Sequence, residues 1–327
     1  MMSRPRPNED AESEALATEP GHGFAFDVTE GLSRHPKTLP CRYFYDARGS
    51  ELFDQITQLP EYYPTSVETD ILAASMPSLA SEVTAGASAL VEFGSGSSMK
   101  TEILLRALPG IACYIPIDVS GSALDAAADR LASRFPRLDI RPTVGDFTQP
   151  ITIPSDVHGL TLIGFFPGST IGNFAPDEAT SLLAAFRSTL APGGRLLIGA
   201  DLKKDVGILI PAYDDAAGVT AAFNLNLLTR INRELGGNFD LARFRHKVIY
   251  DSCKGRIEMH LESTCDQVVT VAKHRFCFRA GETIHTENSH KFTIGEFQAL
   301  ARTAGWQPRR VWTDERQFFS VHDLIAS

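Results

Sequence analysis

Long apolar runs are missing from this chain of 327 residues. No stretch approaches the roughly 20 apolar residues that a membrane-spanning helix needs, and the N-terminal MMSRPRPNEDAESEALATEP lacks the apolar core of a signal peptide. We therefore expect a cytoplasmic protein without a membrane partner. Because residues 1–20 are rich in Pro, Ser, Glu and Ala and offer little that could pack, we expect them to form a disordered tail.

The sequence also lacks an excess of basic charge and any cysteine pattern that is typical of a metal site. The formal net charge is −9, which argues against a nucleic-acid partner because binding phosphates requires clustered Lys and Arg. The five cysteines form no C-x-x-C pair, and His285 and His290 have no third ligand at a suitable spacing. We expect reduced thiols, no bound metal, a small-molecule substrate and a monomer.

A regular alternation of apolar strand-like and amphipathic helix-like segments runs from residue 89 to residue 200. Strands separated by helices predict a parallel, doubly wound sheet. After Asp201 come a long helix-like segment and then stretches of alternating polarity, KVIYDS, RIEMHLES and QVVTVAKHRFCF, which predict antiparallel strands. The helix-like FTIGEFQALARTAGW and two strand-like runs would then complete the first sheet.

The loop in VEFGSGSSMKT carries the first functional signal. From Gly94 it differs from the phosphate-loop pattern GxxxxGK[ST] by Met99, where a backbone that turns around phosphate oxygens requires glycine. Met99 also replaces the last glycine of the GxGxxG pattern of dinucleotide sites. Gly94 and Gly96 still allow a nucleoside to approach the backbone closely at a strand-to-helix turn.

Acidic residues accompany the first three strands of this expected sheet. Glu92 precedes the loop, Asp118 ends CYIPID, and Asp146 follows the third strand in VGDF. A carboxylate at the tip of the second strand can accept both ribose hydroxyls, and Asp146 could accept from an adenine amine with Phe147 against the ring. Either aspartate alone could equally cap a turn or a helix, but together with the loop they indicate a nucleoside site.

The turn APGG before RLLIGAD is common before the fifth strand of class I methyltransferases, so the cofactor looks like S-adenosyl-L-methionine. Lys100 or backbone N–H groups could meet its carboxylate, although Lys100 could equally be a solvated helix residue. The expected cofactor-binding residues are Glu92, Gly94, Ser95, Gly96, Lys100, Asp118, Asp146 and Phe147. We expect a class I (Rossmann-like) α/β methyltransferase domain, residues 66–204 plus 289–327, and a discontinuous α+β substrate-binding domain, residues 21–65 plus 205–288.

Longer motifs cover nearly the whole chain from about Phe24: YFYDARGSELFDQITQLPEYYPT, VEFGSGSSMKT, FFPGSTIGNF, IPAYDD and HTENSHKFT. Together they resemble the histidine-specific N-alpha-methyltransferases of ergothioneine biosynthesis, which make N-alpha-trimethylhistidine (hercynine). The resemblance implies transfer of three methyl groups from S-adenosylmethionine to the alpha-amino group of L-histidine. The aromatic residues between Tyr43 and Tyr63 would form either a packed helical cap or a wall over this ligand.

The resemblance also implies which residues contact the amino-acid end of the substrate. Asn173 would hold the alpha-amino group, while Tyr62 and Tyr213 would bind the amino-acid backbone, with adjacent Tyr63 as the alternative to Tyr62. Asn173, Tyr62 and Tyr213 are the expected catalytic residues, and Gly168 is a further expected contact. Water, rather than a dedicated base, would then carry the amine proton away.

At the other end of the substrate, the resemblance assigns Glu287 and Ser289 to the two ring nitrogens. It places Met259 beside the ring and Tyr45 across a water molecule from it. A neutral imidazole offers one donor and one acceptor, so a carboxylate and a hydroxyl could together bind both nitrogens. On spacing alone, an exposed turn between a strand and a helix is the favoured interpretation of Glu287 and Ser289.

Two other functions fit the same motifs. An enzyme of this fold could act on another amino acid or an imidazole-bearing amine, because a few pocket side chains determine that choice. A non-catalytic protein could bind S-adenosylmethionine without turnover, although the intact set of expected pocket residues counts against it.

Overall fold

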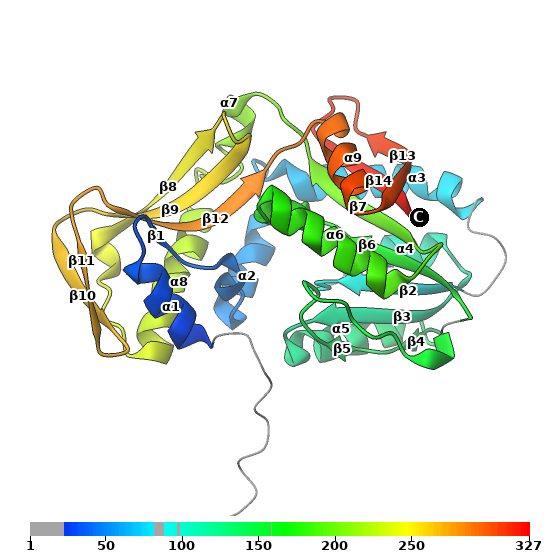
Figure 1. Ribbon diagram of the computed structural model, residues 1–327, viewed down its shortest axis with the longest axis horizontal. Coiled ribbons are helices and arrows are strands. Elements are labelled where there is room, and N and C mark those ends of the chain that lie inside the picture. Colours follow the sequence, from blue (N-terminus) through cyan, green and yellow to red (C-terminus); the bar gives the residue numbers. More distant parts are fainter. Residues whose placement is uncertain (1–22, 82–87, 97–98, 158) are drawn as a thin grey trace, which may run out of the picture.

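Two sheets, each with its own helices, form the two halves of the molecule (Figure 1). The computed structural model describes residues 23–81, 88–96, 99–157 and 159–327. The expected disordered tail, residues 1–20, lies outside these ranges.

The larger sheet has eight strands in the order β13-β14-β7-β6-β2-β3-β4, with β5 also paired to β3. Strands β2 to β7 pair in parallel, whereas β14 is antiparallel to both β7 and β13. This is the expected doubly wound sheet, completed by the C-terminal strand pair. The strands are β2 (Ser88–Phe93), β3 (Ile111–Asp118), β4 (Asp139–Ile140), β5 (Thr143–Val144), β6 (Thr161–Phe166), β7 (Arg195–Asp201), β13 (Trp306–Thr313) and β14 (Phe319–Ala326).

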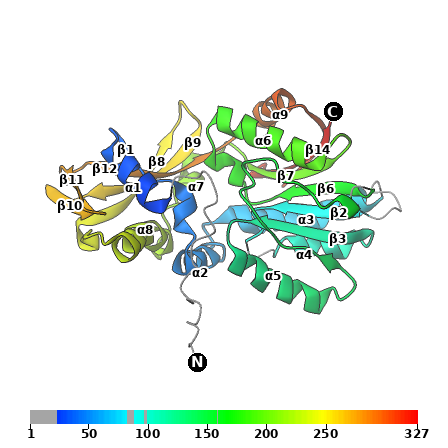
Figure 2. The same ribbon diagram turned by 60° about the horizontal axis from the view of Figure 1, so that its bottom comes forward.

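Helices cover both faces of this sheet, and Figure 2 shows α6 and α9 on one face with α5 on the other. Because the central strands are buried on both sides, they read as continuous apolar runs. Phe93 of β2 stacks on Phe186 of α6 with ring centroids 3.9 Å apart, whereas Leu90 belongs to the core on the opposite face. The helices are α3 (Tyr63–Ala80), α4 (Thr101–Ala107), α5 (Gly121–Arg134), α6 (Pro176–Leu190) and α9 (Ile294–Thr303).

The smaller sheet has four strands in the order β1-β12-β9-β8, and β10 and β11 form a separate antiparallel pair. Helix α8 packs against β8 and β9 on one side and against α2 on the other. The strands are β1 (Lys37–Thr38), β8 (Phe244–Asp251), β9 (Arg256–Ser263), β10 (Gln267–Val271), β11 (His274–Phe278) and β12 (Thr283–His290). The helices of this half are α1 (Phe24–Ser33), α2 (Ala47–Ile56), the short α7 (Val206–Leu209) and α8 (Val219–Leu235), and the 3₁₀ turns of the chain are η1 (Cys41–Phe44), η2 (Ser155–Val157), η3 (Thr170–Asn173) and η4 (Leu241–Arg243).

Local features refine the expected strands and helices. The stretch QVVTVAKHRFCF forms antiparallel strands as expected, and Ala272 and Lys273 turn the chain back between them with positive φ angles of 47° and 69°. The short strands β4 and β5 lie on either side of Arg141 and Pro142, since proline cannot donate to a ladder. Helix α4, after the loop that follows β2, begins at Thr101.

The chain crosses between the two sheets at one place that bears on the site. It leaves the larger sheet after β7 and returns after β12, and there Phe292 N–H donates to Asp201 O at 2.9 Å. Lys203 N–H donates to Phe292 O at 2.9 Å, beside a parallel bridge between Leu202 and Phe292. The end of β7 is therefore fixed next to the end of β12. The expected domain boundaries near this crossing stay a prediction.

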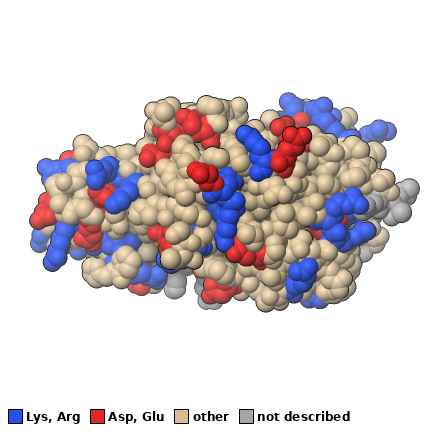
Figure 3. All heavy atoms as spheres, turned by 90° about the horizontal axis from the view of Figure 1, so that it is seen from above, with Lys and Arg blue, Asp and Glu red and all other residues tan. Residues whose placement is uncertain are grey.

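The apolar character of the helices and the surface charge can be compared with the expectation of no membrane and no nucleic-acid partner. Among the described helices, none combines the length and the apolar character that crossing a bilayer requires. On the face shown in Figure 3, Lys and Arg lie in small groups, several beside Asp and Glu, rather than in one continuous basic surface. The expectation that the chain binds no nucleic acid stays a prediction.

Candidate functional site

A cavity collects side chains from segments far apart in the sequence. Its lining comes from α2, the start of α3, the segment around η3, the α7–α8 region, β9 and β12. All the residues expected to bind the substrate line it: Tyr45, Tyr62, Gly168, Asn173, Tyr213, Met259, Glu287 and Ser289. Their contacts with a substrate stay predictions, but the fold brings them together around one space.

Glu287 and Asn173 contact each other across this cavity. Asn173 Nδ2 donates to Glu287 Oε1 at 3.2 Å. The register of β12 against β9 shifts between His285 and Glu287, and this bulge pairs Glu287 with Met259. Burial raises the pKa of Glu287 to about 7, although the Lys291 charge and the Asn173 hydrogen bond both oppose the rise. The carboxyl group can therefore change its protonation state near neutral pH.

Aromatic rings form one wall of the cavity. Tyr45 lies edge-on to Phe53 and Phe223, with ring centroids 5.6 and 5.8 Å apart, and Phe53 lies edge-on to Tyr62 at 6.3 Å. Phe44 is instead fully buried and packs against Phe223 at 4.6 Å. The aromatic segment therefore supplies both the packed cap and the cavity wall that the sequence left as alternatives.

The two adjacent tyrosines at the start of α3 point to different places. Tyr62 lines the cavity and lies edge-on to Tyr213, with ring centroids 6.2 Å apart. The Tyr63 hydroxyl instead lies 2.9 and 2.8 Å from the two carboxylate oxygens of Asp201. This geometry supports Tyr62 as the substrate contact and gives Tyr63 a structural role.

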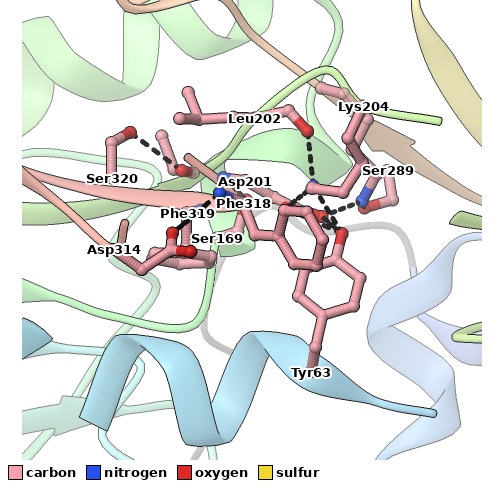
Figure 4. Close-up of polar contacts among 12 residues, drawn as sticks. Tyr63, Ser169, Asp201, Leu202, Lys204, Ser289, Asp314, Phe318, Phe319 and Ser320 are labelled. Carbon is pink, nitrogen blue, oxygen red and sulfur yellow. Dashed lines mark hydrogen bonds and ion pairs between the residues drawn. The ribbon is translucent and has the colours of Figure 1, made fainter. Parts of the chain in front are cut away.

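A buried group of charges surrounds Asp201 at the end of β7, and Figure 4 shows Tyr63 and Lys204 pointing toward it. Lys204 Nζ lies 2.6 Å from Asp201 Oδ1, and Lys291 Nζ lies 2.7 Å from Oδ2. The Asp201 backbone N–H donates to Ser169 Oγ at 2.8 Å. Burial opposes ionisation of Asp201, yet the ammonium groups of Lys291 and Lys204 hold its pKa below the ordinary value. Asp201 is therefore an anion held between two cations.

This charge group reaches the cavity through Lys291. Its ammonium group donates to Tyr213 Oη and to Ser289 Oγ, each at 2.8 Å. These two hydroxyl oxygens lie 2.7 Å apart. Sequence reasoning missed both Asp201 and Lys291 as parts of the site, because charged residues next to strand ends usually lie in water.

A second buried carboxylate was also missed. Glu68 on α3 is fully buried, accepts a hydrogen bond from Gly168 N–H at 2.8 Å, and pairs with Lys100. A Cβ at Gly199 would lie 2.1 Å from Glu68 Oε1, so glycine makes room for this carboxylate. Lys100 thus has an ion-pair partner within the protein, and Ser95 of the adjacent loop is buried. The contacts of both residues with a cofactor stay predictions. The available signal was the spacing of Glu68 with the apolar Ile71 and Leu72, three and four residues further along the helix and on its buried side.

The loop after β2 fits a nucleoside that approaches its backbone. Gly94 and Gly96 have φ angles of +67° and +47°, which favour glycine. A Cβ at Gly94 would come within 3.1 Å of the Phe147 ring, so only glycine leaves that space open. Asp118 accepts from Gly96 N–H at 3.3 Å and from Ser120 N–H at 3.0 Å, at the carboxyl end of β3. These residues would hold the adenosyl part of the expected cofactor.

Two other expected cofactor residues have partners within the protein. Glu92 is buried and accepts from Thr101 Oγ1 at 2.6 Å and from the Tyr114 hydroxyl. Burial raises its pKa to about 7, although both hydrogen bonds oppose this. Asp146 Oδ1 accepts from Thr148 N–H at 2.9 Å and from its hydroxyl at 2.7 Å, as in a turn. Their contacts with a cofactor stay predictions.

A cluster of possible metal ligands lies on the same two strands as Met259 and Glu287. Ligand atoms of Glu258, His260 and His285 lie within 4.8 Å of one another. Burial lowers the pKa of both histidines, but Arg256 donates to Glu258 from its Nε at 2.9 Å and adds a positive charge that would oppose a dication. His290 Nδ1 lies 2.9 Å from a carbonyl oxygen of η3. The expectation of no bound metal stays a prediction.

Known proteins resemble this chain over nearly its whole length. The model of the family described as "Histidine-specific methyltransferase, SAM-dependent" matches residues 24–326. A histidine N-alpha-methyltransferase of Mycolicibacterium smegmatis is 44% identical over 90% of this chain and 92% of its own length. One of Mycobacterium tuberculosis is 42% identical over 94% and 96%. The solved mitomycin 7-O-methyltransferase MmcR is similar with a TM-score of 0.47 and 14% identity, covering 87% of this chain and 59% of that one.

Proposed function

The chain belongs to the family of histidine-specific, S-adenosylmethionine-dependent methyltransferases, and from this premise we propose that it methylates the alpha-amino nitrogen of L-histidine three times. The product would be N-alpha-trimethylhistidine, the first intermediate of ergothioneine biosynthesis. A cytoplasmic location and a monomeric state stay predictions.

The observation that carries the choice of substrate is the chemistry of the cavity lining. At one place the cavity offers a carboxylate, Glu287, and a hydroxyl, Ser289, while Asn173 and Tyr62 lie in the same lining. A carboxylate can accept from one imidazole nitrogen and a hydroxyl can donate to the other. A substrate without such a ring would leave buried polar groups unpaired, which costs about 1–3 kcal/mol for each group.

The methyl donor would lie at the carboxyl ends of β2 and β3, beside Gly94, Gly96 and Asp118, and its sulfonium supplies an activated methyl group when bound. The chain's own contribution is to hold the histidine amine in line with the bond that breaks. Asn173 and the tyrosine hydroxyls can orient a neutral amine without requiring it to stay charged. The amine must lose a proton before each attack, and we assign that proton to water.

The proposal is tested by mass spectrometry of products formed from S-adenosylmethionine and L-histidine, with the other amino acids in parallel. Mono-, di- and trimethylated histidine, with methyl groups on the alpha-nitrogen, are the expected products. Methylation of a different amino acid, or none despite bound cofactor, would overturn the substrate assignment and leave the fold unaffected.

The route of the proton has its own test. The pH dependence of kcat/KM is measured for the wild type and for Asn173→Ala. Both profiles should show the same ionisations, with lower activity in the variant. An ionisation that is present in the wild type and absent from the variant would mean that Asn173 supports a protein base, and the assignment to water would be wrong.

A further inference from the structure

Lys291 lies behind the cavity wall and uses every hydrogen of its ammonium group. Its side chain is fully buried, and Nζ donates to Asp201 Oδ2 at 2.7 Å and to Tyr213 Oη and Ser289 Oγ at 2.8 Å each. An ammonium group has three donors and no acceptor. Each of the two hydroxyl oxygens that Lys291 contacts must therefore accept from it.

The hydrogen bonds of the two hydroxyls can then be counted. Tyr213 Oη and Ser289 Oγ lie 2.7 Å apart, so one of them donates to the other. If Tyr213 donates, both acceptor positions of Ser289 are filled, by Lys291 and Tyr213, and the Ser289 hydrogen can only point elsewhere. If Ser289 donates instead, Tyr213 keeps the free hydrogen and one acceptor position of Ser289 stays open. A phenol hydroxyl is a stronger donor than an alkyl hydroxyl, so Tyr213 donates to Ser289 and the free hydrogen belongs to Ser289, which lines the cavity.

We propose that Lys291 is a positioning residue that, together with Tyr213, makes Ser289 a hydrogen-bond donor toward the substrate, so that the site selects the neutral imidazole ring. This inference rests on the proposed function. A ring nitrogen facing Ser289 must be an acceptor, and the other ring nitrogen, facing Glu287, then carries the hydrogen. Imidazolium has two donors and no acceptor, so it would place a hydrogen against a hydrogen.

Asp201 makes this arrangement possible. A lone ammonium group in this buried position would be strongly disfavoured, and it would also repel a substrate amine. Asp201 compensates the charge of Lys291 at 2.7 Å on the side away from the two hydroxyls. Lys204, at 2.6 Å from Asp201 Oδ1, shares the same anion but donates to Tyr63 rather than to the cavity pair.

The first test uses the wild-type enzyme and needs no substitution. We compare kcat/KM for L-histidine with that for its two pyrrolylalanine isomers, in which C–H replaces one ring nitrogen at a time. For the isomer in which C–H replaces the ring nitrogen that faces Ser289, the histidine-to-pyrrole ratio should be about 10- to 100-fold at pH 8, because this analogue leaves the hydroxyl hydrogen unpaired. It should fall as the pH drops through about 6.5, where imidazole gains a proton. A ratio that rises as the pH drops would overturn the inference.

The second test replaces Lys291 and uses the neighbouring lysine as a control. Lys291→Met opens an acceptor position on Ser289, which can then accept from the ring while Tyr213 still donates to it, so the histidine-to-pyrrole ratio at pH 8 should fall at least about fivefold. Lys204→Met also removes a cation from Asp201 but should leave the ratio unchanged. An unchanged ratio in a folded, cofactor-binding Lys291→Met enzyme would overturn the inference. Absence of histidine methylation in the wild type would instead refute the proposed function itself.

Discussion

Replacing Glu287 by Gln should make the protein more stable at pH 8 while making it a poorer enzyme. Burial raises the pKa of Glu287 from the ordinary 4.5 to about 7. Between these pH values the folded protein holds a proton that the unfolded chain has lost. Stability contributed by this group is therefore present below about pH 4.5 and is lost as the pH rises through about 7.

The magnitude follows from the same pKa. Each unit of pKa corresponds to 1.36 kcal/mol, so a rise from 4.5 to about 7 is worth about 3 kcal/mol at most. Glutamine has nearly the same shape, carries no charge at any of these pH values, and can still accept from Asn173. The stability of Glu287→Gln relative to wild type should thus increase by up to about 3 kcal/mol between pH 4 and pH 8.

The assay is thermal unfolding of both proteins at several pH values, since the titration of all other groups largely cancels in the difference. The difference in Tm should grow in favour of Glu287→Gln by about 5 °C, given about 2–4 °C for each kcal/mol in somewhat smaller proteins. kcat/KM for histidine should fall about 10- to 150-fold, the equivalent of one charged hydrogen bond of about 1.5–3 kcal/mol. A Tm difference that stays constant from pH 4 to pH 8 would refute the reasoning.

Three further substitutions test other parts of the structure. Asp201→Asn leaves two buried ammonium groups without their anion and should lower the free energy of unfolding, measured with denaturant, by about 3–5 kcal/mol. The control is Asp156→Asn, which changes an exposed ion pair with Arg141 and should lower that free energy by less than about 1 kcal/mol. Equal losses in the two variants would contradict the account of Asp201. Asp118→Ala should raise the Kd for S-adenosylmethionine about tenfold or more in calorimetry with little change in Tm, and an unchanged Kd would remove Asp118 from the cofactor site. Asn173→Ala should lower kcat about 10- to 100-fold while the cofactor Kd stays constant, so an equally weakened Kd would point to a general distortion.

Strand and helix periodicity predicted most of the larger sheet correctly, because a buried parallel sheet leaves continuous apolar runs in the sequence. β2, β3, β6 and β7 all follow such runs. The antiparallel strands of QVVTVAKHRFCF were predicted but the turn between them was not, since Ala272 and Lys273 take the positive φ angles that are typical of Gly, Asn or Asp. The turn is held by its two strands rather than signalled by its own residues.

The residues that line the cavity could be predicted from the sequence, whereas the charged residues behind them could not. Asn173, Tyr213 and Glu287 stand in long motifs, and all three line one cavity. The partners Asp201 and Lys291 do not form a motif, because their pairing depends on where two sheets meet. Sequence patterns predict the burial of an apolar side chain. They do not predict the burial of a charged side chain, because that depends on a partner that is distant in the chain.

The crossing between the sheets explains why that pairing matters for the site. Asp201 ends β7 of the larger sheet, and Lys291 directly follows β12 of the smaller one. Their ion pair and the backbone hydrogen bonds of Phe292 connect two strands. These are β7 of the larger sheet and β12, which carries Glu287 and Ser289. Because both passages of the chain are fixed at this point, Glu287 and Ser289, the proposed ring-binding residues, are held in place relative to the larger sheet. A displacement of about 1 Å can cost on the order of 100-fold in rate, so a rigid crossing is what an in-line transfer requires.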